Sequence, residues 1–126
     1  MENIIIIGAG PAGISAALYA ARGNMDPLII NTGIGSLEKA EKIENYYGLE
    51  KPLFGKELFE RGLEQARALG VRILDAQVVG MGGFDTFEVK TTAGDLEARS
   101  VILATGSKRA TAKIPGVKEF EGKGVS

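Results

Sequence analysis

The opening part of the chain changes from an uninterrupted apolar run to apolar positions at helical spacing. Asn3 to Ile7 is a run of consecutive isoleucines, which is typical of a parallel strand covered on both faces. From Pro11 to about Arg22 the chain is rich in alanine, and proline suits the first position of a helix. Pro27 to Asn31 is a second short apolar strand. Strand, turn, helix and strand in about thirty residues predict a βαβ unit with a right-handed crossover.

The middle of the chain predicts a long connection followed by an amphipathic helix. Residues 32–54 contain several glycines, a proline and paired tyrosines, and they predict a loop with one helical turn near Leu37 to Ile43. A loop of this length inside a compact domain is usually functional. Gly55 to Leu69 predicts a helix, because its apolar residues fall on one stripe and its charged residues lie off that stripe. Gly70 is a stop signal after it.

The last part of the chain predicts further strands. Val71 to Val79 is typical of a third core strand. Phe84 to Thr92, a turn at Ala93-Gly94-Asp95 and Leu96 to Arg99 predict a small antiparallel meander. Ser100 to Ala104 predicts another short buried strand.

Three glycines lie in the turn between the first strand and the first helix. Gly8-Ala9-Gly10-Pro11-Ala12-Gly13 matches the pattern G-x-G-x-x-G, in the strand-to-helix context that gives the pattern its meaning. The first glycine permits the tight turn, the second lets the backbone approach a pyrophosphate, and the third lets the helix pack close to the sheet. Amide groups at the positive end of the helix then face the phosphates. Gly8, Gly10, Pro11, Ala12 and Gly13 are predicted to bind a dinucleotide; a merely structural tight turn is the alternative.

The order of the elements and the fingerprint together predict the fold class. We expect an α/β fold: a Rossmann-like FAD/NAD(P)-binding βαβ core with a parallel sheet and a small antiparallel meander, arranged in three layers. The length of 126 residues corresponds to one domain. Residues 1–126 are therefore predicted to form a single, partial nucleotide-binding domain.

Asn31 stands at the end of the second predicted strand, where this fingerprint normally has an Asp or Glu that binds ribose hydroxyls. A neutral amide donates and accepts hydrogen bonds, but it does not offer the two strong acceptors of a carboxylate. No arginine follows closely, which argues against a 2′-phosphate and hence against NADP at this site. Asn31 is predicted either as a ribose ligand or as an ordinary turn residue at a strand end.

The composition limits the chemistry of the chain. Lys and Arg (15) nearly balance Asp and Glu (16), and no segment is strongly basic, so a nucleic-acid partner is not expected. No apolar run approaches the length needed to cross a bilayer, and the N-terminus lacks the charge of a secretory signal. We expect a cytoplasmic protein without a membrane partner. Because neither cysteine nor histidine occurs, no catalytic residue and no metal site are predicted, and redox chemistry requires a bound cofactor.

Four segments of the chain carry a more specific pattern: Gly8 to Ala21, Glu44-Asn45-Tyr46-Tyr47-Gly48, Ile102-Leu103-Ala104-Thr105-Gly106 and Ile114-Pro115-Gly116. Together, and in this order, they resemble the N-terminal FAD-binding part of the low-molecular-weight thioredoxin reductase family. The resemblance covers nearly the whole chain. It implies that the dinucleotide at the fingerprint is FAD rather than NAD.

The resemblance also implies contacts between FAD and residues far from the fingerprint. Gly35-Ser36-Leu37 matches a loop near the flavin, and Asn45 would approach the isoalloxazine ring. The backbone of Val78 would meet the adenine, and Ala104-Thr105-Gly106 would pass beside the cofactor. Each has a plainer alternative: Asn45 as a turn cap, Val78 as core, and Thr105-Gly106 as a strand end. The two tyrosines that follow Asn45 are expected to pack with satisfied hydroxyls rather than to stack on the flavin.

The sequence also departs from the family it resembles. The nicotinamide-binding domain, the redox-active Cys-x-x-Cys and the later Gly-Asp segment that returns to the flavin are absent from these 126 residues. The family's Gly-Gly-Gln loop is altered around Gly33-Ile34-Gly35-Ser36, and Asn31 departs from the acid of many relatives. We therefore expect an FAD-binding domain or subunit of a thioredoxin reductase-like flavin oxidoreductase, which needs a partner chain carrying the rest of the flavin site for full activity.

Two other functions compete with this expectation. One is a non-catalytic or degenerate nucleotide-binding module that folds and forms a homo-oligomer through an exposed sheet edge, without turnover. The other, a stand-alone NAD-binding dehydrogenase domain, is disfavoured because no catalytic acid–base pair is evident and Asn31 is a poor ribose acceptor.

Overall fold

The computed structural model describes residues 1–107, 115–116 and 119. The elements follow one another in the order β1 (Glu2–Ile7), α1 (Pro11–Arg22), β2 (Leu28–Asn31), the 3-10 helix η1 (Gly35–Lys39), α2 (Gly55–Ala68), β3 (Arg72–Asp75), β4 (Val78–Gly82), β5 (Phe87–Thr91) and β6 (Gly94–Leu103). The predicted βαβ unit is confirmed, because β1 and β2 are parallel neighbours joined by α1. No helix in the described ranges combines the length and the apolar character that a bilayer crossing requires.

All six strands form one sheet in the order β3-β2-β1-β6-β5-β4. β3, β2, β1 and β6 pair in parallel, whereas β6, β5 and β4 pair antiparallel. The consecutive isoleucines of β1 place this strand at the centre of the parallel part, with Ile5 and Ile6 fully buried. The carboxyl ends of β1, β2 and β3 therefore lie side by side at one edge of the molecule.

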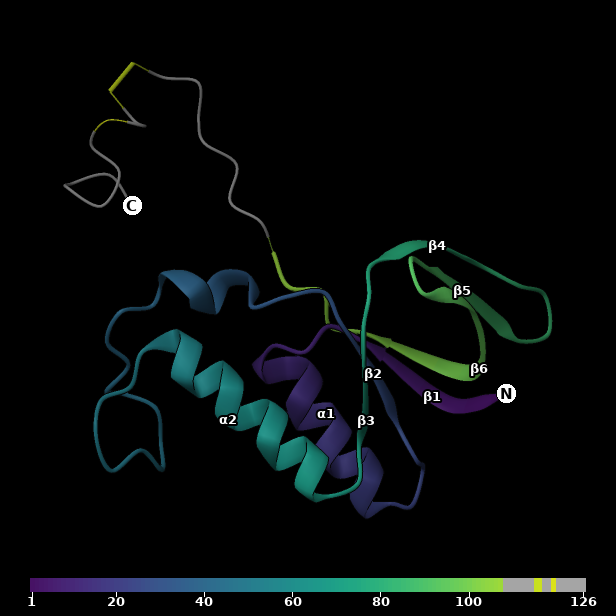
Figure 1. The fold of residues 1–126 in the computed structure, drawn as a ribbon, viewed down its shortest axis with the longest axis horizontal. Helices are drawn as coiled ribbons and strands as arrows, with labels where there is room; N and C mark the ends of the chain where they lie inside the picture. Colours follow the sequence, from purple (N-terminus) through teal and green to yellow (C-terminus); the bar gives the residue numbers. More distant parts are fainter. Residues whose placement is uncertain (108–114, 117–118, 120–126) are drawn as a thin grey trace.

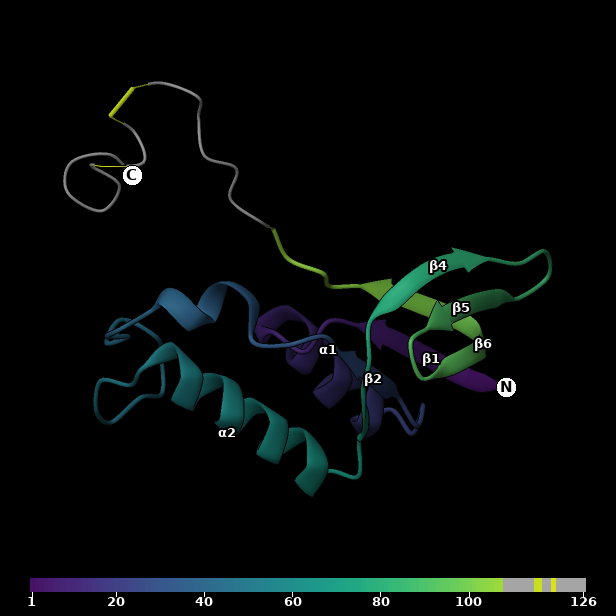
Figure 2. The ribbon, with the colours of Figure 1, turned by 45° about the horizontal axis from the view of Figure 1, so that its top comes forward.

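The sheet separates two apolar clusters, so the molecule has three layers. On one face Ile4, Ile6 and Ile29 pack against residues of α1 and α2. On the opposite face Ile5 and Ile30 belong to a second cluster, which includes side chains of β5 and β6. Figures 1 and 2 show the two helices on one side of β1 and β2, and the β4–β5 hairpin on the other side. The predicted fold class, a three-layer Rossmann-like α/β core with a small meander, is confirmed.

The prediction of a single third strand over Val71 to Val79 is wrong. β3 and β4 are separate strands, joined by Ala76 and Gln77. The chain leaves the parallel ladder between these two residues: the N–H of Ala76 still donates to the carbonyl of Asn31 at 3.1 Å, whereas the N–H of Gln77 donates to the Thr92 hydroxyl at 3.0 Å. The sequence does not mark this break, because no glycine or proline interrupts residues 71–79 and the apolar residues Val78 and Val79 follow the polar ones directly.

The two strands predicted at Leu96 to Arg99 and Ser100 to Ala104 are one continuous strand, β6. Its first half pairs antiparallel with β5 and its second half pairs parallel with β1. Ala98, which is fully buried, lies at the change of partner, opposite Phe87 on one side and Glu2 on the other. No glycine or proline interrupts residues 95–103 at this change of partner, so the sequence carries no mark of it, which explains the error.

Candidate nucleotide-binding site

Two of the fingerprint glycines are enclosed by backbone. Gly8 has φ of 114°, and a Cβ placed there would lie 2.0 Å from the carbonyl oxygen of Ala104. A Cβ at Gly13 would lie 1.9 Å from the carbonyl oxygen of Gly8. Contacts this short exclude any side chain, so these glycines bring the turn, the helix and the end of β6 together. This is the close packing that the sequence predicted for the first and third positions.

Gly10 lies between them in a different environment. A Cβ at Gly10 would meet no atom within 4 Å, although its φ of −73° is one that any residue adopts. Gly10 is the N-cap of α1; no side chain caps this helix end and no acid stands in its first turn. The first amides of a helix have no partner within the helix and carry its positive dipole. The space in front of Gly10 is therefore open, electropositive and lined by unpaired donors.

The end of β6 lies against this turn. The N–H of Ala104 donates to the carbonyl of Ile7 at 2.8 Å, and the N–H of Gly8 donates to the carbonyl of Ile30 at 3.0 Å. The parallel ladders thus continue up to the glycine turn. Thr105 and Gly106 follow, both exposed, and Gly106 has φ of 71°.

Both polar atoms of the Asn31 side chain form hydrogen bonds within the protein. Its Oδ1 accepts the N–H of Gly33 at 3.1 Å, and its Nδ2 donates to Oδ1 of Asp75 at 3.0 Å. The first bond is that of a turn residue at a strand end, one of the two roles left open by the sequence. The second bond leads to a carboxylate on the next strand, since Asn31 and Asp75 are register partners in β2 and β3.

Asp75 is the polar residue of this edge that sequence reasoning missed. It ends β3, is exposed, and borders a shallow hollow at the carboxyl ends of the strands, lined by Asn31, Thr32, Gly33, Asp75, Ala76, Gln77 and Thr92. The available signal was an acid directly after the apolar pair Ile73-Leu74. Asp75 was not recognised as a strand-end residue, because the third strand was predicted to continue to Val79.

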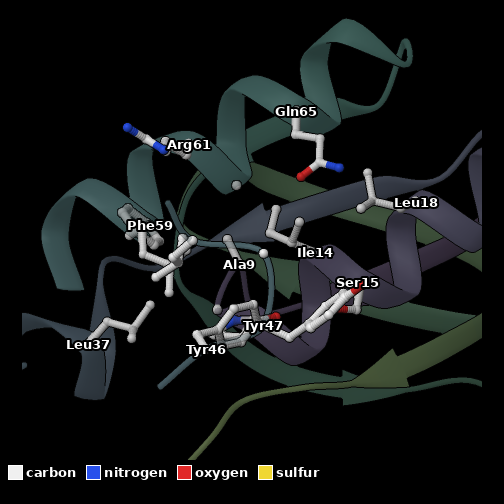
Figure 3. Close-up of a pocket in the computed structure, with 16 residues that line it drawn as sticks. Ala9, Ile14, Ser15, Leu18, Leu37, Tyr46, Tyr47, Phe59, Arg61 and Gln65 are labelled. Atoms are coloured by element: carbon white, nitrogen blue, oxygen red, sulfur yellow. The ribbon is translucent and has the colours of Figure 1, made fainter. Parts of the chain in front are cut away.

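A second hollow adjoins the glycine turn on its helix side. Figure 3 shows it between α1, α2 and the connection that follows β2, lined by Ala9, Gly10, Pro11, Ile14, Ser15, Leu18, Leu37, Tyr46, Tyr47, Gly48, Leu49, Leu58, Phe59, Arg61, Gly62 and Gln65. Tyr46 is 51% exposed and Tyr47 is fully exposed. The expectation that these tyrosines serve mainly as packing is therefore wrong; they form the outer wall of this hollow.

The comparisons with known proteins agree with this geometry. The sequence pattern of the pyridine nucleotide-disulphide oxidoreductase family matches residues 2–126. The chain belongs to this family.

Thioredoxin reductase of Treponema pallidum is 42% identical over 127 residues, which cover 98% of this chain and 41% of the relative. Thioredoxin reductase of Bacillus subtilis is 38% identical, covering 98% of this chain and 40% of the relative. The crystal structure of Lactococcus lactis thioredoxin reductase has a TM-score of 0.83 at 35% identity, covering 100% of this chain and 42% of that chain.

The chain thus spans about 40% of the length of the curated relatives it matches. Its resemblance to the N-terminal FAD-binding region of thioredoxin reductases is confirmed. FAD is the cofactor of this oxidoreductase family, in agreement with the cofactor predicted from the sequence. The glycine turn fits a pyrophosphate, because Gly10, the one glycine of the three in the fingerprint with open space in front of it, stands at the positive end of α1.

The resemblance to the thioredoxin reductase family also implies a role for Gly35-Ser36-Leu37, which lie in the connection after β2. Gly35, Ser36 and Leu37 open η1, which begins earlier and ends earlier than the helical turn predicted near Leu37 to Ile43. Leu37 is half-buried against the helix layer, and its carbonyl oxygen would lie 1.9 Å from a Cβ at Gly55, the first residue of α2. This contact fixes one end of the connection against α2.

Two further residues singled out by the resemblance, Asn45 and Val78, do not line the hollow beside the glycine turn. Asn45 is exposed, in a bend next to the tyrosines. Val78 begins β4 opposite Thr91. Its half-buried side chain packs on the second apolar cluster, the one that contains Ile5 and Ile30. The hollow beside Asp75 is lined by the two residues before Val78, not by Val78 itself. Ile114, in the last segment of the resemblance, lies outside the described residues.

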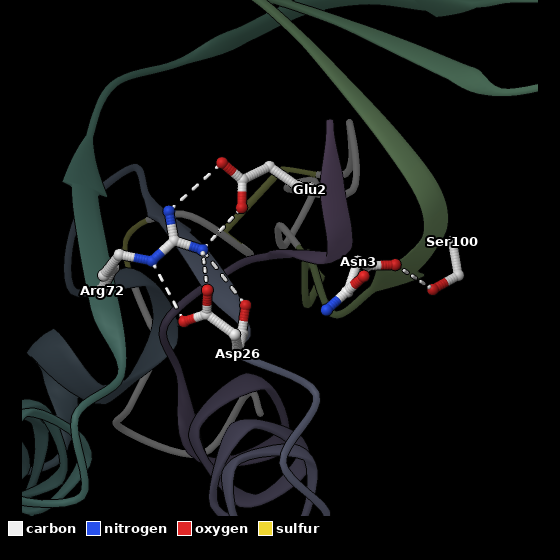
Figure 4. Close-up of polar contacts among 5 residues, drawn as sticks. All are labelled: Glu2, Asn3, Asp26, Arg72 and Ser100. Carbon is white, nitrogen blue, oxygen red and sulfur yellow. Dashed lines mark hydrogen bonds and ion pairs between the residues drawn. The ribbon is translucent and has the colours of Figure 1, made fainter.

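A polar cluster lies at the opposite, amino-terminal edge of the sheet. Figure 4 shows the guanidinium of Arg72, from β3, between Glu2 of β1 and Asp26, which precedes β2. Arg72 donates to Glu2 through Nη1 at 3.2 Å and Nη2 at 2.5 Å, and through Nε to Asp26 at 3.3 Å. The hydrogen bond from Arg72 holds the pKa of Glu2 below its usual range, and the same bond raises the pKa of Arg72. This cluster links β1, β3 and the segment before β2, at the end of the β2–β3 ladder opposite to Asn31 and Asp75.

Proposed function

We propose that this chain acts as a single FAD-binding domain, residues 1–126, of a thioredoxin reductase-like flavin oxidoreductase, and that it reaches full activity only with a partner chain that carries the rest of the flavin site. The observation that carries the proposal is the open backbone at Gly10 between two glycines closed by carbonyl oxygens. If all three glycines served only the packing of the fold, a Cβ at Gly10 would also meet neighbouring atoms, as it would at Gly8 and Gly13.

The roles of the chain's residues in this proposal are binding and orientation. Amides around Gly10, Ala12 and Gly13 hold the pyrophosphate, with Gly8 and Pro11 shaping the turn. Residues of the neighbouring strand ends and of the connection, namely Asn31, Gly35, Ser36, Leu37, Asn45, Val78, Ala104, Thr105 and Gly106, surround the remainder of the cofactor. When bound, FAD supplies the electron and hydride chemistry. No residue of this chain is proposed as catalytic.

The need for further segments follows from what the chain offers. The curated relatives are about two and a half times as long, since this chain covers 40–41% of them. The chain has no cysteine, so it holds no dithiol to receive electrons from a flavin. Electron transfer to a disulfide therefore requires groups supplied from outside these residues. The cytoplasm remains the proposed compartment, to be tested by fractionation.

Substitution at Gly10 tests the binding proposal. We expect Gly10→Ala to weaken FAD binding at least tenfold, because its methyl group would occupy the space proposed for the phosphates, while the melting temperature of the cofactor-free chain stays nearly unchanged. Binding is measured by quenching of flavin fluorescence. Gly23→Ala, at the other end of α1, is the matched control, since a Cβ there meets its nearest atom at 3.5 Å. Equal FAD affinity in the wild type and the Gly10 variant would refute the proposal.

A non-catalytic, self-associating module is the second candidate, favoured by one observation. The second half of β6 pairs with β1 but has no strand on its other side within the described part of the chain, and Leu103 there is 63% exposed. An open edge of this kind recruits another strand. Native mass spectrometry separates the two candidates: a homo-oligomer without flavin supports this module, and a flavin-carrying species supports the first proposal.

A further inference from the structure

The ribose of the bound nucleotide needs an acceptor that β2 does not provide. In dinucleotide-binding folds a carboxylate at the end of the second strand accepts hydrogen bonds from the ribose hydroxyls. Here that position is Asn31, whose Oδ1 accepts the N–H of Gly33 and whose Nδ2 donates to Asp75. With both ends of its amide engaged by the protein, Asn31 offers only weak acceptor capacity to a ligand.

We propose that Asp75 is the carboxylate that accepts the ribose hydroxyls of the adenosine half of the cofactor, and that Asn31 is the positioning residue that holds it. This inference rests on the proposed function, because it assigns a residue to the ribose of the nucleotide bound at the glycine turn. It moves the ribose acceptor from the end of β2 to the end of β3.

The position of Asp75 supports this role. Asp75 and Asn31 are register partners at the carboxyl ends of adjacent parallel strands, and such strands lie about 4.8 Å apart. The 3.0 Å bond from Asn31 draws the carboxylate toward β2. It therefore lies within one strand spacing of the place where an acid on β2 would stand. Ligands of open parallel sheets bind outside these carboxyl ends.

The chemistry of the Asp75 carboxylate is suitable. A carboxylate offers about four acceptor sites, and the amide of Asn31 uses one of them. Asp75 is exposed and borders the hollow beside Asn31 and Gln77, so a ribose edge can reach it. A hydrogen bond to a charged acceptor is stronger than one between neutral groups. The same charge repels a 2′-phosphate, which gives the site a preference for unphosphorylated ribose.

The test compares ligands that differ only at the ribose. Calorimetry of the 126-residue chain measures the affinity for ADP, for 2′,3′-dideoxy-ADP and for adenosine 2′,5′-bisphosphate. We expect the wild type to prefer ADP to the dideoxy compound about tenfold or more. Asp75→Asn, which keeps the size of the side chain and an acceptor for Asn31, should abolish this preference without changing the dideoxy affinity. Affinity for the 2′,5′-bisphosphate should rise. Asp85→Asn, in the β4–β5 loop, makes the same change of charge elsewhere and should alter none of these values.

An exchange of the two side chains tests whether the site requires one carboxylate in the Asn31–Asp75 pair, on either strand. Asn31→Asp combined with Asp75→Asn places the carboxylate on β2 and the amide on β3, with the bond between them reversed. We expect this double variant to recover the preference for ADP over the dideoxy compound, an effect that a purely structural bond would not produce.

The outcomes separate this inference from the function on which it rests. If ADP and dideoxy-ADP bind the wild type equally, or if Asp75→Asn weakens both equally, the ribose role of Asp75 is refuted while nucleotide binding stands. If neither ligand binds, the proposed function itself fails, and this inference fails with it.

Discussion

The three glycines of the first turn have different surroundings at the scale of single residues. The enclosed glycines, Gly8 and Gly13, serve the packing of the fold, and the open one, Gly10, is the one proposed to face the ligand. Gly8 and Gly13 are each within about 2 Å of a carbonyl oxygen, measured from an added Cβ, whereas Gly10 faces open space. The fingerprint in the sequence predicted all three positions. It could not predict the contacts of Asn31, because the hydrogen-bond partner of an amide depends on which strand becomes its neighbour.

Gly13→Ala should destabilise the fold itself. Alanine gains about 1 kcal/mol over glycine in a helix, but crowding of a packed site typically costs about 1–3 kcal/mol. Because the added Cβ would lie 1.9 Å from a backbone oxygen, we expect the steric cost to exceed the gain and the free energy of unfolding to fall. Urea denaturation measures this change.

Gly62→Ala is the matched control for that substitution. Gly62 lies in α2, and an added Cβ would meet Ile14 at 3.6 Å, an ordinary contact. The gain in helix propensity is the same, so the control variant should be as stable as the wild type or up to about 1 kcal/mol more stable. A Gly13 variant as stable as the Gly62 variant would show that the helix can shift away from the turn at no cost.

At the scale of elements, the sequence located the strands better than it located their partners. β1, α1, β2 and α2 were predicted almost to their ends, because a buried apolar run and a helical stripe are local patterns. The division of Val71 to Val79 and the fusion of the last two predicted strands were missed, because both depend on pairing between distant segments. The same limit applies to Arg72, whose partners Glu2 and Asp26 are 70 and 46 positions away.

The Arg72 cluster should stabilise the sheet in a pH-dependent way. The pKa of Glu2 in the folded chain is lowered, first by its hydrogen bond with Arg72. A carboxyl group with a lowered folded pKa contributes stability above its unfolded pKa and loses it as the pH falls through the folded value. We expect Glu2→Gln to lower the free energy of unfolding by roughly 0.5–1 kcal/mol at pH 7. The difference from the wild type should shrink below the ordinary pKa of 4.5.

Glu44→Gln provides the control for this pH dependence. Glu44 pairs with Lys42 at 3.3 Å, but both side chains are more than 60% exposed, and such pairs contribute little. The variant should match the wild type in urea denaturation at pH 7 and at pH 4. A pH-independent loss in the Glu2 variant would assign the effect to packing of the side chain rather than to its charge.

At the scale of the whole molecule, the proposed contacts to the nucleotide half of FAD and those to its ring lie in different parts of the structure. The glycine turn and the Asn31–Asp75 pair stand on the ends of β1, β2 and β3, in the parallel part of the sheet, where ladder hydrogen bonds hold the strands in register. The ring-side candidate Asn45 is exposed on the connection between β2 and α2. An isolated bridge between Ile43 and Leu53 and a few local hydrogen bonds hold this connection, which takes no part in the ladders of the sheet. The strand ends are therefore preorganised and the connection offers little buried surface.

This division predicts which part of FAD the isolated chain recognises. A ligand that binds only the folded state raises its stability by RT ln(1 + [L]/Kd), about 2.7 kcal/mol at a hundred times Kd. We expect ADP and FAD to raise the melting temperature over similar concentration ranges, and riboflavin to raise it not at all, because the preorganised amides and carboxylate contact phosphate and ribose. Thermal unfolding with each ligand measures this. Stabilisation by riboflavin without stabilisation by ADP would place the main binding energy at the connection and would make the strand ends a framework only.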